Sequence, residues 1–333
     1  MKLNKIIFIA EIGVNHNGSI KILSNLIKKI SKARVDFVKF QAFKAESTVT
    51  RNAPKANYQK KIKLSQFEML KKYELNSKLL DQIHKTCKKN KIKPLFSIFD
   101  LESLANLKKY RHEYFKIPSG EITNYPLLKE VGKLNKKIFL STGMSSLQEI
   151  KNAVKILINN GTKNKNLFIL HCHSDYPSRF EDLNLIRIKK LQSFFDNNIG
   201  YSDHSIGSEA SIAAVALGAK VIEKHVTLNT SMKGPDHSSS LPIVDLINLI
   251  KGIRNIEKSI GTSDFKRSKI ENKNKLMVRK SLVAKSDIKK GEKFTTTNLT
   301  CKRPGSGISP IFWNKVLNKK AKINFNKDDL IKL

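Results

Sequence analysis

The sequence predicts an α/β fold: a (β/α)₈ TIM barrel followed by a small β-rich domain. Short apolar runs alternate strictly with amphipathic helical stretches over most of the chain, and this alternation is typical of a parallel sheet. Eight runs and eight helical stretches can be counted, which favours a closed barrel over an open sheet. After residue 262 the pattern changes to short strand-like runs and turn signals with little helix, so a second, smaller domain is expected there.

Each repeating unit of the expected barrel pairs one apolar run with one amphipathic stretch. The first run contains Glu11 and no cleavage-type segment follows it, so we interpret it as a strand and not as a signal peptide. The expected strands are 6–13, 37–41, 94–99, 114–119, 137–142, 167–172, 199–204 and 221–227. The expected helices lie near 19–33, 77–90, 101–110, 125–134, 146–159, 183–195, 207–218 and 242–261.

The domain boundaries follow from the changes in composition. Residues 1–262 are expected to form the barrel, 263–279 a polar linker with one helical turn, and 280–333 the small domain. A domain of about 55 residues is marginal on its own, so we expect it to pack on the barrel or on a partner subunit. The longest strand-to-helix connection, 42–76, is expected to lie over the carboxyl ends of the strands, where barrel active sites are built.

The chain is strongly basic, with 63 Lys and Arg against 28 Asp and Glu and a net charge of +35. Such a charge can indicate an anionic partner. However, only nine of the basic residues are arginine, the usual reader of bases and phosphates, and the lysines are scattered over the expected helix faces. We therefore interpret the charge as a lysine-rich solvated surface and expect no nucleic-acid partner.

The number of cysteines and the hydropathy indicate the compartment in which the protein is expected. Cys87, Cys172 and Cys301 are too few and too far apart for a disulfide framework, which indicates a reducing cytoplasm. No stretch reaches the roughly 18 uncharged apolar residues that a membrane-spanning helix needs. We expect a cytoplasmic protein with no membrane partner.

Polar residues stand out at the ends of the expected strands. Three strands carry two polar residues that are two positions apart and therefore share a face. These pairs are Lys39 and Gln41, Ser202 and His204, and Glu223 and His225. If the faces point inward, the pairs meet at one barrel mouth. Buried polar groups need partners, so their convergence at the carboxyl ends of several strands indicates a functional site.

Two residue types at this mouth suggest its chemistry. His204 and His225 are candidate metal ligands, because neighbouring strand ends can bring two imidazoles onto one ion and leave positions open for water and substrate. Few thiolates and plentiful oxygens favour Mn²⁺ or Mg²⁺ over structural zinc. Lys39 and Lys116 lie on expected strands, where an unpaired ammonium is costly. Each therefore needs an anion, either a phosphate or carboxylate of a substrate or an internal glutamate.

Taken in order, the motifs of the chain resemble those of the sialic acid synthase family, which includes N-acetylneuraminate synthases and N,N'-diacetyllegionaminate synthases. The matching stretches include IAEIGVNHNGS, VKFQAFKAE, FKIPSGEITNYPLL, STGMSS, LHCHSDYP, GYSDHS, VIEKHVTL, MKGPDHSSSL, RKSLVAKSDIKKGE and KRPGSGISP. The resemblance covers nearly the whole chain. It implies a barrel followed by an antifreeze-like (SAF, β-clip) domain, and a domain-swapped homodimer in which the small domain of one subunit covers the barrel mouth of the other.

The resemblance also implies a reaction. The family condenses phosphoenolpyruvate with an N-acylated hexose in open-chain form and water, and releases phosphate. From the sequence we prefer N-acetylmannosamine as the sugar and N-acetylneuraminate as the product. The alternative is an N,N'-diacetyllegionaminate synthase, whose diacetamido-trideoxy hexose lacks one hydroxyl and carries an extra acetamido group. We expect the discrimination to lie in loops such as 42–76.

The site residues are implied by the same resemblance. His204 and His225 would bind the divalent metal, with Mn²⁺ preferred over Mg²⁺ or Co²⁺, and the metal would polarise the sugar aldehyde. Glu121 would handle the water that adds to C2 of phosphoenolpyruvate, and Glu11 and Lys116 are the other catalytic candidates. The residues implied to bind phosphoenolpyruvate are Lys39, Gln41, Ser97, Lys116, Ser119, Ser174 and Ser202. Those implied to bind the sugar are Glu11, Tyr176, Asp236 and, from the partner subunit, Arg303.

The chain departs from the family pattern at two places. Ser97 stands where many relatives have threonine, so a hydroxyl remains for contact with phosphate. After the sixth strand the chain reads HSDYP, so Asp175 is one methylene shorter than the usual glutamate and His173 adds a titratable group. We interpret His173 as a bystander and not as a further metal ligand.

Two other classes of function stay open from the sequence alone. An aldolase-type lyase could use Lys116 to form a Schiff base with pyruvate, although the two histidines favour a metal. A binding module could use the basic surface for an anionic polymer. Its binding would then fall steeply with salt, without turnover of phosphoenolpyruvate.

Overall fold

The computed structural model describes residues 5–55, 63–196 and 198–333. The chain divides into two compact units, Met1–Thr262 and Ser263–Leu333, and each is described by itself. Within the described residues, no helix is long and apolar enough to cross a membrane.

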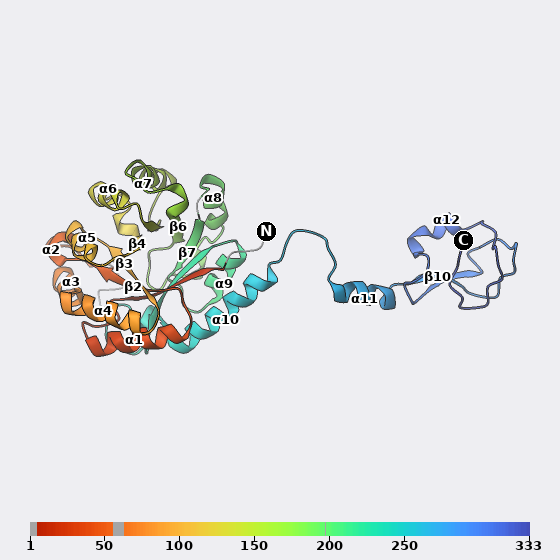
Figure 1. The fold of residues 1–333 in the computed structure, drawn as a ribbon, viewed down its shortest axis with the longest axis horizontal. Helices are drawn as coiled ribbons and strands as arrows, with labels where there is room; N and C mark the ends of the chain where they lie inside the picture. Colours follow the sequence, from red (N-terminus) through yellow and green to blue (C-terminus); the bar gives the residue numbers. More distant parts are fainter. Residues whose placement is uncertain (1–4, 56–62, 197) are drawn as a thin grey trace. The chain divides into compact units, whose positions relative to one another are not determined.

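Eight parallel strands form the barrel of the first unit, and helices surround them (Figure 1). Each strand pairs with the next along the chain, and β1 also pairs with β8, which closes the barrel. The strands are β1 (Ile7–Gly13), β2 (Phe37–Ala42), β3 (Lys93–Ile98), β4 (Tyr114–Ile117), β5 (Lys137–Ser141), β6 (Leu167–Cys172), β7 (Asn198–Asp203) and β8 (Val221–Thr227). The main helices are α1 (Ile20–Lys32), α4 (Ser77–Lys89), α5 (Leu101–Lys108), α6 (Tyr125–Lys133), α7 (Leu147–Asn159), α8 (Arg187–Phe194), α9 (Glu209–Ala216) and α10 (Ile243–Ser259). The predicted (β/α)₈ barrel is confirmed.

The inside of the barrel has an apolar layer below the polar residues of the strand ends. This layer consists of Ile9, Phe37, Leu95, Phe139, Phe168, Leu170 and Val221. Ile9 precedes Glu11 by two residues and Val221 precedes Glu223 by two, so each pair shares the inward face of its strand. A larger apolar core lies between the strands and the surrounding helices. The polar residues at the strand ends therefore lie above a packed floor, as in other barrels of this class.

The connection from β2 to α4 carries two short helices that the sequence analysis did not predict. They are α2 (Ala45–Thr48) and α3 (Gln66–Tyr73), while residues 56–62 of the predicted insertion lie outside the described residues. Helix α3 begins with a capping box, in which Ser65 and Glu68 satisfy each other's backbone N–H groups. Its buried side chains Met69 and Tyr73 pack in a small cluster with Val14 and Phe43.

The second unit has a core of its own. Strands β10 (Ser281–Ala284) and β11 (Leu299–Lys302) pair antiparallel, and a short helix α12 (Trp313–Val316) follows. Leu282, Phe294 and Phe325 are among its buried side chains. Helix α11 (Lys269–Val278) occupies much of the stretch predicted to be a linker with one helical turn. It has a capping box at Ser268 but no buried side chain.

Candidate active site

The strand register places the predicted polar residues side by side at the carboxyl end of the barrel. Glu11 on β1 lies opposite Lys39 on β2 and His225 on β8. Gln41 on β2 lies opposite Ser97 on β3, and Ser97 lies opposite Lys116 on β4. Ser202 on β7 lies opposite Glu223 on β8. The pairs found by alternation therefore meet around one mouth.

A buried charge network connects these strands, and Glu223 is at its centre. Its carboxylate lies 3.0 Å from Lys39 Nζ and accepts hydrogen bonds from Lys116 Nζ at 2.9 and 3.1 Å. Ser202 Oγ donates to the same carboxylate at 2.9 Å. The two lysines and Glu223 are each less than 5% exposed. The sequence analysis placed Glu223 on the same face as His225 but assigned it no role. The signal that could have found it is the requirement that two buried ammonium groups share an anion.

The second carboxylate, Glu11, is less fully engaged. Lys39 Nζ lies 3.5 Å from Glu11 Oε2 and donates to Ser97 Oγ at 3.0 Å. Gln41 Nε2 donates to Glu11 Oε1 at 3.4 Å, and Oε2 has no hydrogen-bond partner among the described residues. Glu11 therefore keeps an acceptor free inside the mouth.

Burial and the neighbouring charges shift the pKa values of this network. Burial opposes ionisation of Glu223, but Lys116 and Lys39 together outweigh it and hold the pKa of the Glu223 carboxyl below its usual range. Burial, assisted by the charge of Lys39, lowers the pKa of Lys116 to about 8 in spite of the attraction of Glu223. Burial also raises the pKa of Glu11, and Glu223 adds to this rise while Lys39 opposes it.

His204 and His225 present two neutral imidazoles to the mouth, with ring centroids 5.7 Å apart. His204 Nδ1 lies 2.6 Å from the carbonyl oxygen of His173, so we assign the proton to Nδ1 and the lone pair to Nε2, which lies 3.3 Å from Ser202 Oγ. His225 Nδ1 is buried without a hydrogen-bond partner among the described residues, 3.9 Å from Asp236. Burial lowers the pKa of His204 to about 4 and that of His225 well below its usual value.

This donor set fits a divalent metal. Metal-bound imidazoles are neutral, and a backbone carbonyl on the far nitrogen, as His204 has, is a common way to orient such a ligand. Among the described residues, no group of three or more His, Cys, Asp and Glu could hold a metal ion. Two histidines would therefore leave the remaining positions of a bound ion to water and substrate.

Hydroxyl groups line the other side of the mouth. Ser119 Oγ accepts from the Gly143 N–H at 2.9 Å and lies 3.1 Å from Cys172 Sγ. A Cβ at Gly143 would lie 2.1 Å from Ser174 Oγ, so only glycine lets the backbone approach this closely. Ser141 Oγ is buried and has no partner among the described residues. Hydroxyls and a backbone N–H of this kind can surround an anion.

These side chains enclose a cavity of about 350 Å³. Eleven of the predicted site residues line it, namely Glu11, Lys39, Gln41, Ser97, Lys116, Ser119, Ser174, Tyr176, Ser202, His204 and His225. Asp236 lines a smaller annex of about 60 Å³, which shares Gln41, Leu70, Tyr176 and His225 with the main cavity. Burial, together with the charge of Glu11, raises the pKa of Asp236 to about 7.

The comparisons with known proteins agree along the whole chain. The model of the NeuB family matches residues 26–265, and that of the SAF domain matches residues 279–333. The chain is 48% identical to the N,N'-diacetyllegionaminic acid synthase of Campylobacter jejuni, over 99% of this chain and 100% of that one. It is 36% identical to the synthase of the same name from Legionella pneumophila, with 96% and 91% covered. A solved N-acetylneuraminic acid (sialic acid) synthetase from Leptospira borgpetersenii, in complex with citrate, matches with a TM-score of 0.71 at 30% identity, covering 81% of this chain and 90% of that one.

The chain belongs to the sialic acid synthase (NeuB) family. Its relatives are synthases, so it is an enzyme that catalyses a condensation. The resemblance found from the motifs is confirmed, and so is the SAF domain at the carboxyl end.

Two predicted site residues need separate mention, because Glu121 is not among the residues that line the cavity and Arg303 belongs to the other unit. Glu121 ends the 3₁₀ turn Ser119–Glu121, and its half-buried carboxylate accepts a hydrogen bond from Asn124 Nδ2 at 2.7 Å. Burial raises its pKa. Arg303 belongs to the second unit, where it is exposed. The roles implied for both stay predictions.

Of the residues that depart from the family pattern, Ser97 lines the cavity, whereas His173 and Asp175 lie outside its wall. His173 Nδ1 lies 2.9 Å from Ser178 Oγ. Asp175 is exposed and accepts a hydrogen bond from the backbone N–H of Tyr176. The structure therefore brings neither side chain into the wall of the main cavity.

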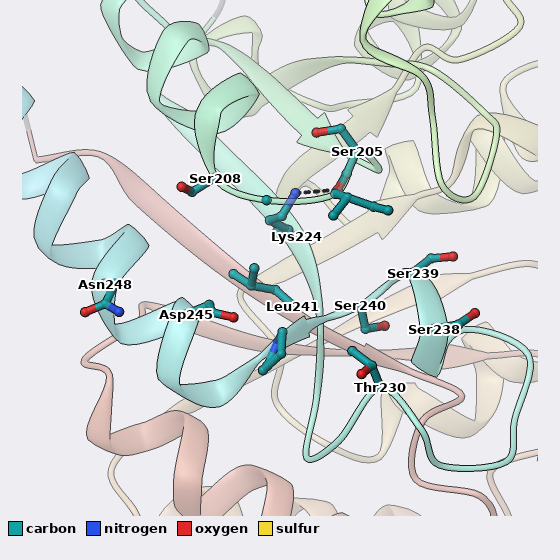
Figure 2. A pocket seen from close by; sticks show the side chains of 13 residues that line it. Ser205, Ser208, Lys224, Thr230, Ser238, Ser239, Ser240, Leu241, Asp245 and Asn248 are labelled. Atoms are coloured by element: carbon teal, nitrogen blue, oxygen red, sulfur yellow. Dashed lines mark hydrogen bonds between the residues drawn. The ribbon is translucent and has the colours of Figure 1, made fainter.

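A second cavity of the barrel, of about 410 Å³, lies beside the strand ends and is rich in serine (Figure 2). Lys224 lines it and points away from the mouth, because it alternates with Glu223 and His225 along β8. Its ammonium donates to Asp203 at 2.7 Å and to the carbonyl oxygen of Ser205 at 2.8 Å. Lys224 therefore has a structural pairing, and it belongs to a different site from Lys39 and Lys116.

Proposed function

We propose that this enzyme condenses phosphoenolpyruvate with an open-chain diacetamido-trideoxy hexose and water, and so acts as an N,N'-diacetyllegionaminate synthase. The observation that carries the reaction is the mouth itself, in which two buried ammonium groups and a set of hydroxyls lie beside two neutral imidazoles. The 48% identity to a synthase of this name over the full chain supports the diacetamido sugar. This identity supports the diacetamido sugar better than it supports N-acetylmannosamine, the sugar that the sequence analysis preferred.

The lysines and hydroxyls would bind phosphoenolpyruvate. Its phosphate and carboxylate are anions that Lys39 and Lys116 can pair with, although both ammonium groups also contact Glu223 and Lys39 lies 3.5 Å from Glu11. The serines around Gly143 supply further hydrogen-bond donors. Because these side chains are already held in place, little free energy is needed to orient them. This arrangement stabilises the phosphate as it leaves.

His204 and His225 would hold a divalent metal, with Mn²⁺ preferred. When bound, such an ion supplies Lewis-acid polarisation of the sugar aldehyde. The chain contributes the fixed orientation of both imidazoles and a mouth in which the two substrates are held together, which is worth much of the rate enhancement in a bimolecular reaction. Tyr176, Glu11 and Asp236 lie where they could hold the sugar hydroxyls.

The bonds and protons balance in this scheme. C3 of the enol attacks the aldehyde carbon, a water oxygen bonds to C2, and the resulting adduct loses phosphate to leave a keto acid. One of the two water protons passes through a carboxylate to the aldehyde oxygen, which becomes a hydroxyl, and the other leaves with the phosphate. Glu121 is the proposed carboxylate. Its turn begins at Ser119 and Gly120, which both line the cavity.

The test is phosphate release from phosphoenolpyruvate with the diacetamido-trideoxy hexose and with N-acetylmannosamine, each with and without a chelator. We expect the diacetamido sugar to give the higher kcat/KM, the chelator to abolish release, and Mn²⁺, Mg²⁺ or Co²⁺ to restore it. Higher kcat/KM with N-acetylmannosamine would overturn the sugar assignment. Full activity in a preparation shown to be metal-free by elemental analysis would remove the metal. Inactivation by borohydride in the presence of pyruvate would instead indicate a Schiff base on Lys116.

A further inference from the structure

The annex beside the main cavity has walls of a different chemistry. Four of the residues that line it are shared with the cavity or lie at its edge, namely Gln41, Leu70, Tyr176 and His225. The annex extends from there to Val14, Met69, Tyr73, Pro235 and Asp236. It opens beside His225, the candidate metal ligand, so a group on the sugar can enter it while the aldehyde lies at the mouth.

The annex is apolar on one side and polar on the other. Val14, Met69 and Tyr73 are 6%, 2% and 6% exposed and belong to the cluster in which Leu70 also packs. On the other side Asp236, 6% exposed, and the Gln41 amide face the same space. A hydroxyl group would leave the apolar wall uncovered, whereas a group with an amide at one end and a methyl at the other would meet both sides.

The size of the annex fits such a group. A single water needs about 10–15 Å³ of such space, so about 60 Å³ admits a group of a few heavy atoms. An acetamido group has four heavy atoms, of which the last is a methyl. A sugar ring or a longer acyl chain is too large.

We infer that the annex receives the extra acetamido group of the sugar and selects it, with Leu70 and Met69 of α3 packing on its methyl while Asp236 and Gln41 meet its amide. This inference rests on the proposed function and names its specificity-determining residues. It also places the discrimination in the insertion between β2 and α4, which was the region expected from the sequence.

The experiment compares Leu70→Asn with Leu64→Asn. Leu→Asn keeps the side chain close to its original shape and makes it polar, and Leu64 is part of the same apolar cluster but lines neither cavity. For each variant, kcat/KM is measured with the diacetamido-trideoxy hexose and with N-acetylmannosamine. We expect Leu70→Asn to lower the ratio of the two values about tenfold or more, the scale of a lost methyl contact in an apolar pocket. KM for phosphoenolpyruvate should stay the same, and Leu64→Asn should keep the wild-type ratio.

A second arm uses the wild-type enzyme and needs no variant to fold. N-acetylmannosamine is compared with its 6-deoxy analogue and with an analogue that carries an acetamido group at the position of the extra one but keeps the 6-hydroxyl. We expect kcat/KM to rise when the acetamido group is added and not when the 6-hydroxyl alone is removed. A preference that follows the 6-deoxy carbon alone, or an unchanged ratio in folded Leu70→Asn, overturns the inference. Absence of phosphate release with every sugar instead removes the proposed function, and the inference with it.

Discussion

Glu223 is the carboxylate that pairs with both buried lysines of the mouth, Lys39 and Lys116. If its charge is removed, two ammonium groups remain close together in a buried space with only Glu11 nearby. Removing one partner of a buried ion pair costs about 3–5 kcal/mol, most of it the penalty of the charge left behind. The same residue that organises the site therefore also stabilises the barrel.

We predict that Glu223→Gln lowers the free energy of unfolding by about 3 kcal/mol or more and abolishes phosphate release. The measurement is urea unfolding together with the activity assay. Glu113→Gln is the matched control, since Glu113 pairs with Lys93 at 3.5 Å on the exposed surface, where such pairs contribute little. Equal stability of the two variants would contradict the assignment.

Glu121 requires a different test, because its role rests on the family and not on the position of its side chain. We predict that Glu121→Gln keeps the fold and the affinity for phosphoenolpyruvate but lowers kcat by about 10²-fold or more, the scale of a general acid–base group. The physical reason is that burial raises its pKa, so it can both take and give a proton. A kcat close to that of the wild type would remove Glu121 from the mechanism.

Alternation along strands predicted part of the site, and the family resemblance supplied the rest. Alternation placed Lys39 with Gln41 and His204 with Ser202, and the structure has all four in the cavity wall. It could not predict that Glu223 pairs with two lysines, since such pairing joins strands that are far apart in sequence. Nor could it predict the direction of Glu121, because that depends on a hydrogen bond within a 3₁₀ turn.

At the scale of elements, helix α4 and the turn before β4 meet through two histidines. His84 Nε2 and His112 Nε2 lie 3.3 Å apart, and the His84 ring stacks on Tyr110 with centroids 3.7 Å apart. Burial, with a smaller contribution from His84, lowers the pKa of His112 to about 4. The contact between His84 and His112 therefore depends on neutral imidazole rings.

The sign of the pH effect follows from this shift. The unfolded chain takes up a proton on His112 near its ordinary pKa of about 6.5, whereas the folded chain does so only near pH 4. Stability is therefore fully present above pH 6.5 and is lost as the pH falls toward 4, at up to about 1.4 kcal/mol per pH unit for one proton. We predict a shallower loss in His112→Gln, measured by urea unfolding between pH 7 and 4. Tyr110→Phe, which removes a neighbouring hydroxyl that does not titrate in this range, should keep the wild-type slope.

The strands were easier to predict than the short helices. Each strand is a run of buried apolar residues, and all eight lie where the sequence analysis expected them. Helices α3 and α11 were missed or underestimated because α3 is only eight residues long and α11 buries no side chain. Both begin with a Ser-x-x-Glu capping box at Ser65 and Ser268, which is a local signal that hydrophobic periodicity does not include.

At the scale of the whole molecule, the second unit presents features of a docking module. Ile270, Leu276 and Met277 of α11 are 71%, 55% and 67% exposed, and Ile311 is 84% exposed. Exposed apolar side chains gathered on so small a unit indicate a contact surface. They support the proposal, first implied by the family resemblance, that the enzyme is a homodimer in which this unit serves the barrel of the partner.

If the enzyme is the proposed domain-swapped homodimer, two chains contribute to each site, and mixing two inactive variants should restore activity. Arg303→Ala and His225→Ala should each be inactive, because one lacks the residue that reaches the sugar and the other lacks a metal ligand. In a swapped heterodimer of the two variants, one site carries both lesions and the other carries neither. Random exchange gives about half heterodimers, so about a quarter of all sites should be intact and activity should return to about a quarter of the wild-type value.

The control is the wild-type dimer taken through the same exchange procedure, with mass spectrometry to establish that mixed dimers formed. If Arg303 served the barrel of its own chain, every site in the mixture would carry one lesion. No activity would then return in spite of exchange, and the swap would be excluded. The chemistry of the mouth would be unaffected by that result, because Lys39, Lys116 and Glu223 all belong to a single barrel.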